Sequence, residues 1–123
     1  MSVHTRSQKL AQAAFPRIQA RDAEMTKDEF DKYRTIAKKF PSLVHTCGLA
    51  QAVAFALAKQ ENDYIKDLAA VLRDIGHPEI TSARTLHERA GTQPLSGYLR
   101  LSRDAIDASS WLKRYVEAAR EGE

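Results

Sequence analysis

The sequence predicts a single all-α domain, a compact bundle of about six helices spanning residues 1–123. Apolar residues recur at three- and four-residue steps along most of the chain, as helices with one buried face require. Hairpin dipeptides and sustained alternation of β-branched or aromatic residues, which mark strands, do not occur. The hydrophobic and charged fractions, 43% and 28%, are those of an ordinary globular domain. A chain of this length can bury a core without disulfide bonds.

The first two helices are predicted from their apolar faces and from one capping motif. The first is expected over residues 5–25, with Pro16 producing a kink or a break near Gln12 because proline removes one backbone donor. Its apolar stripe consists of Leu10, Ala11, Ala14, Phe15, Ile18 and Met25. The second begins at a capping box formed by Thr26 and Glu29. Its buried face is expected to hold Phe30, Tyr33, Ala37 and Phe40.

A third helix is predicted to begin at Pro41, because proline suits the first position of a helix, and to run to about Lys59. Apolar groups surround it on nearly all sides, which is typical of a central helix. We expect Gly48 to allow a close approach by a neighbouring helix. Cys47 is most simply a small buried side chain, and His45 a hydrogen-bonded residue of the core or its rim.

The remaining three helices are predicted from glycine and proline residues that end helices and from their apolar spacing. A fourth is expected from about Asn62 until Gly76-His77-Pro78 ends it. A short fifth helix should span residues 82–90 and end at Gly91. The last begins near Ser96 and has a regular packing seam. That seam consists of Tyr98, Leu101, Ala105, Ala108, Leu112, Tyr115 and Ala119.

The sequence predicts no catalysis, no cofactor and no metal site. None of the four histidines pairs with a histidine, cysteine or carboxylate at ligand spacing within one helix, and no phosphate-binding or nucleophile motif is present. The single cysteine excludes an internal disulfide bond. Residues 1–9 lack a secretory signal and no run approaches the ~20 apolar residues of a membrane span, so we expect a cytoplasmic protein.

Charge is unevenly distributed, which favours binding to a polyanion. Residues 1–60 hold ten Lys/Arg against five Asp/Glu, whereas residues 61–123 hold nine against eleven. Cations on the first, second and last helices could contact such a polyanion, although solvated surface charge explains them equally well. Trp111 lies beside the cations of the last helix, and its side chain is either half-buried or available for base stacking.

Three stretches, residues 5–14, 32–59 and 98–118, resemble one known family. The most specific features are Lys39-Phe40-Pro41 followed by Gly48-Leu49, the run Ala52-Val53-Ala54-Phe55, and the ending Trp111-Leu112-Lys113-Arg114-Tyr115. Together they resemble the small helical subunit of the type III-B CRISPR effector, the Cmr complex. Cys47 departs from this pattern, in which an amide is expected before Gly48.

The resemblance implies a non-catalytic part of a ribonucleoprotein that acts in antiviral defence. Several small subunits would stack in a minor filament beside the backbone subunits and line the channel where guide RNA and target RNA pair. The expected partners are therefore backbone and large Cmr subunits, further small subunits, guide RNA and target RNA, with no membrane. The cations that could then contact RNA phosphates are the candidate RNA-binding residues Arg6, Lys9, Arg17, Arg21, Lys38, Lys39, Arg100, Arg103 and Arg114. Cleavage and second-messenger synthesis would belong to other subunits.

A second apolar stripe on the last helix, formed by Leu95, Leu99 and Ile106, is the candidate protein interface. The alternative is that Leu95 and Leu99 pack under the loop from Gly91 to Pro94. Two other functions stay open. One is a stand-alone helical regulator that binds nucleic acid through a helix-turn-helix at one of the two glycine-proline breaks. The other is an adaptor that binds only proteins.

Overall fold

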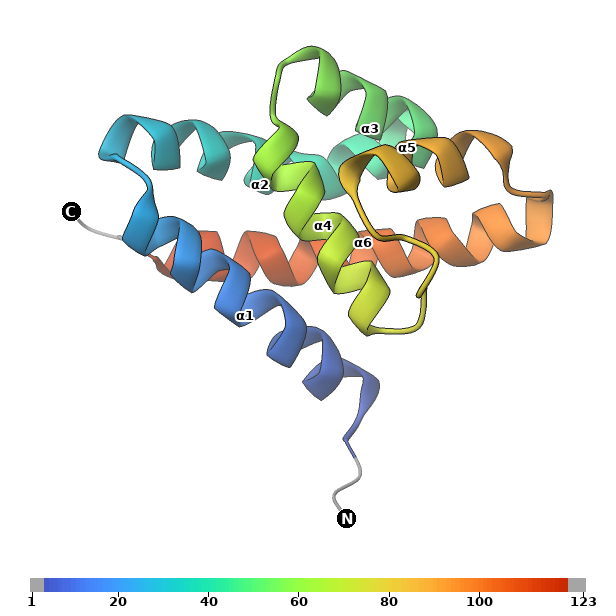
Figure 1. Cartoon of the computed structure of the whole chain (residues 1–123), viewed down its shortest axis with the longest axis horizontal. Coiled ribbons are helices and arrows are strands. Elements are labelled where there is room, and N and C mark those ends of the chain that lie inside the picture. Colours follow the sequence, from blue (N-terminus) through green and yellow to red (C-terminus); the bar gives the residue numbers. More distant parts are fainter. Residues whose placement is uncertain (1–3, 120–123) are drawn as a thin grey trace.

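The computed structural model describes residues 4–119, which form six helices and no strand. In order these are α1 (Arg6–Glu24), α2 (Lys27–Cys47), α3 (Leu49–Ala58), α4 (Asn62–Asp74), α5 (Ala83–Thr92) and α6 (Leu95–Ala118). The long helices α2 and α6 pack against each other along the longest axis of the molecule, and α1 runs obliquely to them and packs on α6 and α4 (Figure 1). The predicted all-α bundle is therefore confirmed.

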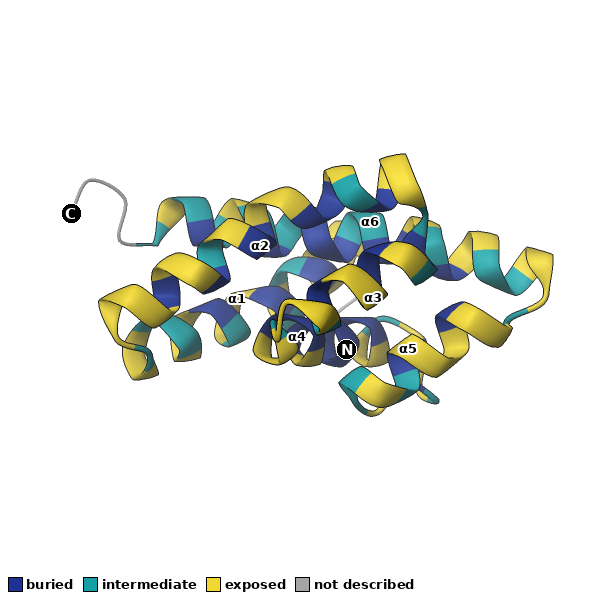
Figure 2. Ribbon diagram, turned by 90° about the horizontal axis from the view of Figure 1, so that it is seen from above, coloured by how far each residue is buried: buried dark blue, intermediate teal, exposed yellow. Residues whose placement is uncertain are grey.

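The central helix is α4, which packs against each of the other five helices. Eight of its thirteen residues are buried, from Tyr64 through Leu72 with the exception of Lys66. In Figure 2 its buried residues lie between the exposed outer faces of the surrounding helices. The prediction that the stretch from Pro41 to Lys59 forms the central helix was wrong.

That stretch is instead divided between two helices. Pro41 lies inside α2, where Phe40 and Val44 on either side of it are buried, so tertiary packing outweighs the lost backbone hydrogen bond. The chain breaks at Gly48, which has φ of 85° and ψ of 160°, a backbone conformation that only glycine adopts readily.

The break at Gly48 changes the environment of the last turn of α2. Cys47 and His45 both lie there and are exposed, so the prediction of a buried cysteine was wrong. Of the two places predicted for His45, the core and its rim, the core is excluded. The periodicity of one long helix would have placed Cys47 beside buried neighbours. A chain that turns at Gly48 leaves it at the open end of α2.

Side-chain caps fix the start of three helices. Thr5, Thr26 and Ser82 each accept a hydrogen bond from the backbone N–H three residues later in a full capping box. The predicted capping box at Thr26 is confirmed, and its helix buries Phe30, Tyr33, Ala37 and Phe40 as expected.

Two positions where the sequence suggested that a helix could break lie inside continuous helices. α1 continues through Pro16, and because Gln12 and Pro16 are both exposed, water can replace the missing donor. α5 continues through Gly91 to Thr92. Within the residues that the structure describes, no helix is long and apolar enough to cross a membrane.

Gly48 also permits the close approach of α6 that the sequence suggested. A Cβ at this position would lie 3.1 Å from the Tyr98 hydroxyl oxygen, which accepts a 3.3 Å hydrogen bond from the Ala50 N–H at the start of α3. We expect Gly48→Ala to lower the free energy of unfolding by about 1–3 kcal/mol through backbone strain. Urea denaturation measures this difference.

Gly91→Ala is the matched control for this substitution. Gly91 lies inside α5, and a Cβ added there would meet no other atom, so alanine should leave stability unchanged or raise it by up to about 1 kcal/mol. Equal effects of the two substitutions would contradict a special role for Gly48.

Candidate nucleic-acid interface

The basic flank of α1 packs against carboxylates of α4. Arg21 donates two hydrogen bonds to the Asp67 carboxylate, from Nε at 2.9 Å and from a terminal nitrogen at 3.2 Å. A terminal nitrogen of Arg17 lies 3.7 Å from the same carboxylate, and one of Arg21 lies 3.7 Å from Asp63. Asp67 is 1% exposed, so these arginines neutralise a charge that would otherwise be buried alone.

Tyr33 completes this network from α2. Its hydroxyl donates a 2.5 Å hydrogen bond to the Asp67 carboxylate. Burial raises the pKa of Tyr33 well above its ordinary value, and the neighbouring Asp67 charge raises it further. The hydrogen bond to Asp67 likewise raises the pKa of Arg21, which therefore stays protonated. The network thus joins α1, α2 and α4.

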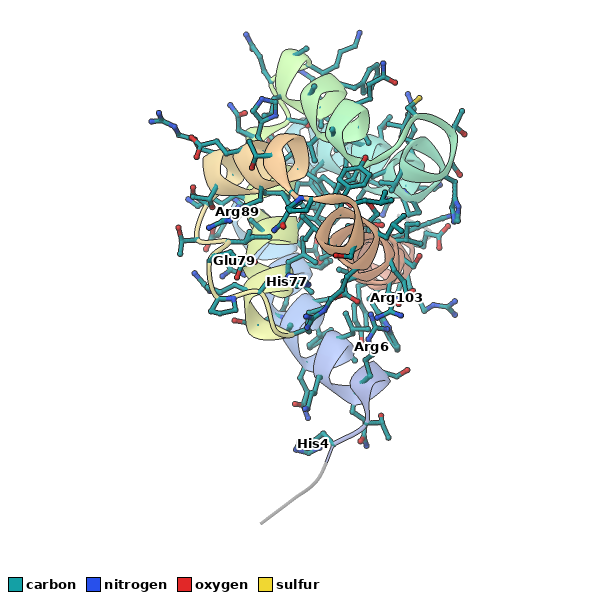
Figure 3. All side chains as sticks on the ribbon, turned by 90° about the vertical axis from the view of Figure 1, so that its right-hand side faces the viewer. His4, Arg6, His77, Glu79, Arg89 and Arg103 are labelled. Carbon is teal, nitrogen blue, oxygen red and sulfur yellow. The ribbon has the colours of Figure 1, made fainter. Side chains whose placement is uncertain are left out.

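A second cluster joins the start of α1 to α6 and to the connection between α4 and α5. Arg6 donates to both Asp104 and Asp107 at 2.5 Å. His77 is buried in the connection, as part of the predicted turn, and its Nε2 lies 2.7 Å from the Asp104 carboxylate. Figure 3 shows Arg6, His77 and Glu79 around this end of the bundle. The pairing of His77 with Asp104 was not predicted from the sequence, because the two residues lie on different elements.

This cluster has no converging set of metal ligands. The Nδ1 atom of His77 lies 3.6 Å from Glu79 while its Nε2 atom faces Asp104, so the two carboxylates lie on different sides of the ring. Among residues 4–119, no group of three histidine, cysteine, aspartate or glutamate side chains could hold a metal ion.

Asp104 makes the second cluster sensitive to acid. Burial on its own would raise the pKa of Asp104, but hydrogen bonds from His77 and Arg6 outweigh burial and hold the pKa below its ordinary value. The carboxylate therefore stabilises the fold above the pKa that it has in the unfolded chain. This contribution is lost as pH falls through the lower pKa of the folded state.

We expect Asp104→Asn to lower the free energy of unfolding at pH 7 by about 1.5–3 kcal/mol, the range for hydrogen bonds to charged groups. The difference from the parent should shrink as the pH falls below about 4, where the unfolded parent protonates its own carboxylates. Urea denaturation between pH 3 and pH 7 tests this. A difference that does not change with pH would contradict it.

The two clusters pair some of the excess cations of residues 1–60 with carboxylates of residues 61–123. Three arginines of the first helix, Arg6, Arg17 and Arg21, pair with carboxylates of the C-terminal half, so part of the basic excess of residues 1–60 is neutralised within the molecule. Of the nine candidate RNA-binding residues, Arg6, Arg17, Arg21 and Arg103 have a carboxylate within 4 Å. The other five, Lys9, Lys38, Lys39, Arg100 and Arg114, are exposed and make no ion pair with the described residues.

One exposed cation lies beside a tryptophan. Arg114, Arg6 and Trp111 line a hollow of about 310 Å³ between α1 and α6. Trp111 is half-buried, and its ring centroid lies 5.8 Å from that of Tyr115. This geometry fits the interpretation of a half-buried tryptophan packed among aromatic neighbours. The Arg114 side chain is exposed at this hollow, whereas the Arg6 guanidinium is held by Asp104 and Asp107.

The three residues of the candidate protein interface do not lie on one exposed surface. Leu95 and Leu99, at the start of α6, are 74% and 59% exposed, so the alternative that they pack under the loop is wrong. Ile106 is partly buried against the core and does not share their exposed surface. The two leucines therefore form an exposed apolar end of the bundle.

A second exposed apolar surface lies toward the other end of α6. It was not expected from the sequence, in which Phe15 belongs to the apolar stripe of the first helix. Phe15 is 46% exposed and packs edge-to-face on Tyr115, with centroids 5.2 Å apart. Both line a hollow of about 280 Å³ between α1 and α6. The helical stripe of α1 is wider than the face that α6 covers, so Phe15 is left at its edge.

The geometry gives little support to a helix-turn-helix. Eight residues, 75–82, connect α4 to α5, whereas the motif uses a turn of three or four. Only Gln93 and Pro94 separate α5 from α6, and the start of α6 exposes two leucines rather than a polar recognition surface.

Comparisons with known proteins agree over almost the whole chain. A family model described as CRISPR-associated protein (Cas_Cmr5) matches residues 6–119. The CRISPR system Cmr subunit Cmr5 of Thermus thermophilus is 37% identical over 120 residues, which cover 94% of this chain and 96% of that protein. A crystal structure of a Cmr5 family protein from the same organism superposes with a TM-score of 0.83 at 36% identity. The superposition covers 96% of this chain and all of that one.

Proposed function

Because the chain belongs to the Cmr5 family of CRISPR-associated proteins, we propose that it is a non-catalytic small subunit of a type III-B Cmr ribonucleoprotein. In this role it joins backbone and large subunits in the cytoplasm and supports the pairing of guide RNA with target RNA in antiviral defence. The match over residues 6–119 is the observation that carries the proposal. It includes all six helices, so the whole fold of the chain is that of the family.

The subunit role is tested by reconstitution. The chain is mixed with the other Cmr subunits of the same organism, with and without guide RNA, and the assembly is purified by size. We expect the chain to co-purify with the guide-loaded assembly. A chain that elutes alone in both mixtures would contradict the proposal.

Stacking of several copies is supported by the two exposed apolar surfaces. A repeated head-to-tail contact needs two different patches on each copy, one for each neighbour. The Leu95 and Leu99 end and the Phe15 and Tyr115 hollow lie toward opposite ends of α6, which extends along the long axis of the molecule (Figure 1). We propose that the leucines of one copy dock on the hollow of the next.

RNA contact is supported by the five exposed cations, which lack a base-reading motif and therefore suit phosphate binding. Replacing Lys9 and Arg114 with glutamine should weaken target RNA binding by the assembled complex. It should also reduce the slope of log affinity against log salt by about 0.7–0.9 for each phosphate that the variant no longer neutralises. Binding titrations at several salt concentrations measure this slope.

Arg84→Gln is the control, because Arg84 pairs with Glu88 on the outer face of α5 and is not a candidate contact. The paired arginines Arg17 and Arg21 are unsuitable for this test, since they hold the buried Asp67. A salt slope that is the same in the parent and in the Lys9 and Arg114 variant would contradict phosphate contact by these residues.

A further inference from the structure

A hollow between α2 and α3 gathers three lysines around an exposed aromatic ring. Lys32, Lys39 and Lys59 line it together with Phe55, and its volume is about 350 Å³. Phe55 is 38% exposed although it lies on the most apolar helix of the chain. Of these residues, Lys39 is the one that the sequence marked as a candidate RNA-binding residue.

The lysine charges converge on the ring from two helices. The Nζ atom of Lys39 lies 5.9 Å from the centroid of the Phe55 ring, and that of Lys59 lies 5.8 Å from it. No carboxylate of the described residues lies within ion-pair distance of Lys32, Lys39 or Lys59. The ammonium groups of Lys39 and Lys59 are thus held near the ring by weak attraction, and Lys32 attracts the Glu61 carboxylate without forming an ion pair with it. All three lysines remain available to an anion.

The chemistry of the hollow matches one nucleotide. An exposed aromatic ring offers a stacking surface for a base, and flexible lysine stems can swing from the ring to the adjoining phosphates. A volume near 350 Å³ lies at the lower end of the range for small-ligand pockets. Bases within a duplex already stack on both faces, so only an unpaired nucleotide can use the ring.

We propose that the Phe55 hollow binds an unpaired nucleotide of single-stranded RNA, with the base on Phe55 and the phosphates on Lys32, Lys39 and Lys59. This inference rests on the proposed RNA-binding function and adds to it a site on a different pair of helices from the Arg114 and Trp111 hollow. Glu61 also lines the Phe55 hollow, where its carboxylate opposes an anionic ligand.

The test measures binding of the full chain to a fluorescent single-stranded RNA of about 12 nucleotides, and to the same RNA in a duplex, by anisotropy. Phe55→Leu keeps an apolar side chain but removes the stacking surface. It should weaken single-strand binding about tenfold and duplex binding by less than about twofold, with little change in the salt slope. Because Phe55 is partly exposed, this variant is expected to fold, which circular dichroism checks.

Charge variants give an independent test. Lys39→Gln and Lys59→Gln should each reduce the single-strand salt slope by about 0.7. Glu61→Gln removes the opposing charge and should tighten single-strand binding, a gain that a purely structural role would not produce. Lys66→Gln is the matched control, since Lys66 is exposed on α4 and lines no part of this hollow.

Three outcomes would overturn the inference. Phe55→Leu could leave single-strand binding unchanged, or weaken single strand and duplex equally. It could also leave RNA binding intact while lowering assembly with the other subunits, in which case the hollow binds protein. If the Lys9 and Arg114 variant weakens RNA binding while Phe55→Leu does not, this inference fails and the proposed function stands. If neither the chain nor its assembly binds RNA, both fail.

Discussion

A chain carrying Leu95→Lys and Leu99→Lys is expected to fold normally and to stop stacking on a neighbouring copy. Both leucines are largely exposed, so lysine at these positions costs the isolated fold little. Leucines at the centre of a docked surface typically contribute more than about 1 kcal/mol each, so the pair should weaken the stacking interface at least roughly thirtyfold. The complex should then carry at most one copy of the chain.

Native mass spectrometry of the reconstituted complex counts the copies, and thermal unfolding confirms that the variant is folded. Phe15→Lys should reduce stacking in the same way, because it alters the receiving hollow rather than the leucine end. Ile106→Lys is a contrasting variant that should destabilise the isolated domain, since Ile106 packs against the core. If the complex holds as many copies of the leucine variant as of the parent chain, the stacking interface lies elsewhere.

Asp67→Ala is expected to have the largest effect on stability. It leaves the Arg21 guanidinium and the Tyr33 hydroxyl without their buried acceptor and removes the counter-charge near Arg17. Breaking a buried ion pair from one side typically costs about 3–5 kcal/mol, a large part of the roughly 5–15 kcal/mol that stabilises a domain. The midpoint of thermal unfolding should fall by roughly 10–20 °C.

Asp63→Ala is the matched control on the same helix. Its carboxylate also lies near Arg21, at 3.7 Å, but the side chain is 58% exposed, so its loss should cost no more than about 1 kcal/mol. Equal losses from the two variants would contradict a special role for the buried pair.

The same network predicts a response to alkali. The raised pKa of Tyr33 means that the folded chain keeps a proton that the unfolded chain releases near pH 10. Stability should therefore fall as pH rises above about 10, and Tyr33→Phe should reduce that fall. Urea denaturation between pH 8 and pH 11 compares the two chains.

The sequence by itself determined the fold class, the approximate positions of the helices and the family. Local signals suffice for these, because capping at Thr26 and the apolar spacing of α2 act within a few residues. The positions at which one helix ends and the next begins were less predictable. Proline is favoured at the start of a helix, yet α2 continues through Pro41 because Phe40 and Val44 pack in the core. The free energy of this packing cannot be inferred from a local sequence pattern.

Tertiary structure alone decided which cations are already paired. Arg6 and Arg21 look equivalent to Lys9 and Arg114 in the sequence, since each is a positive charge on a helical flank. Only the crossing of α1 over α4 and α6 brings Asp67 and Asp104 to the two arginines. Electrostatic pairing depends on distances between residues far apart in the chain, so the sequence identifies the charges and the fold selects those that remain for a partner.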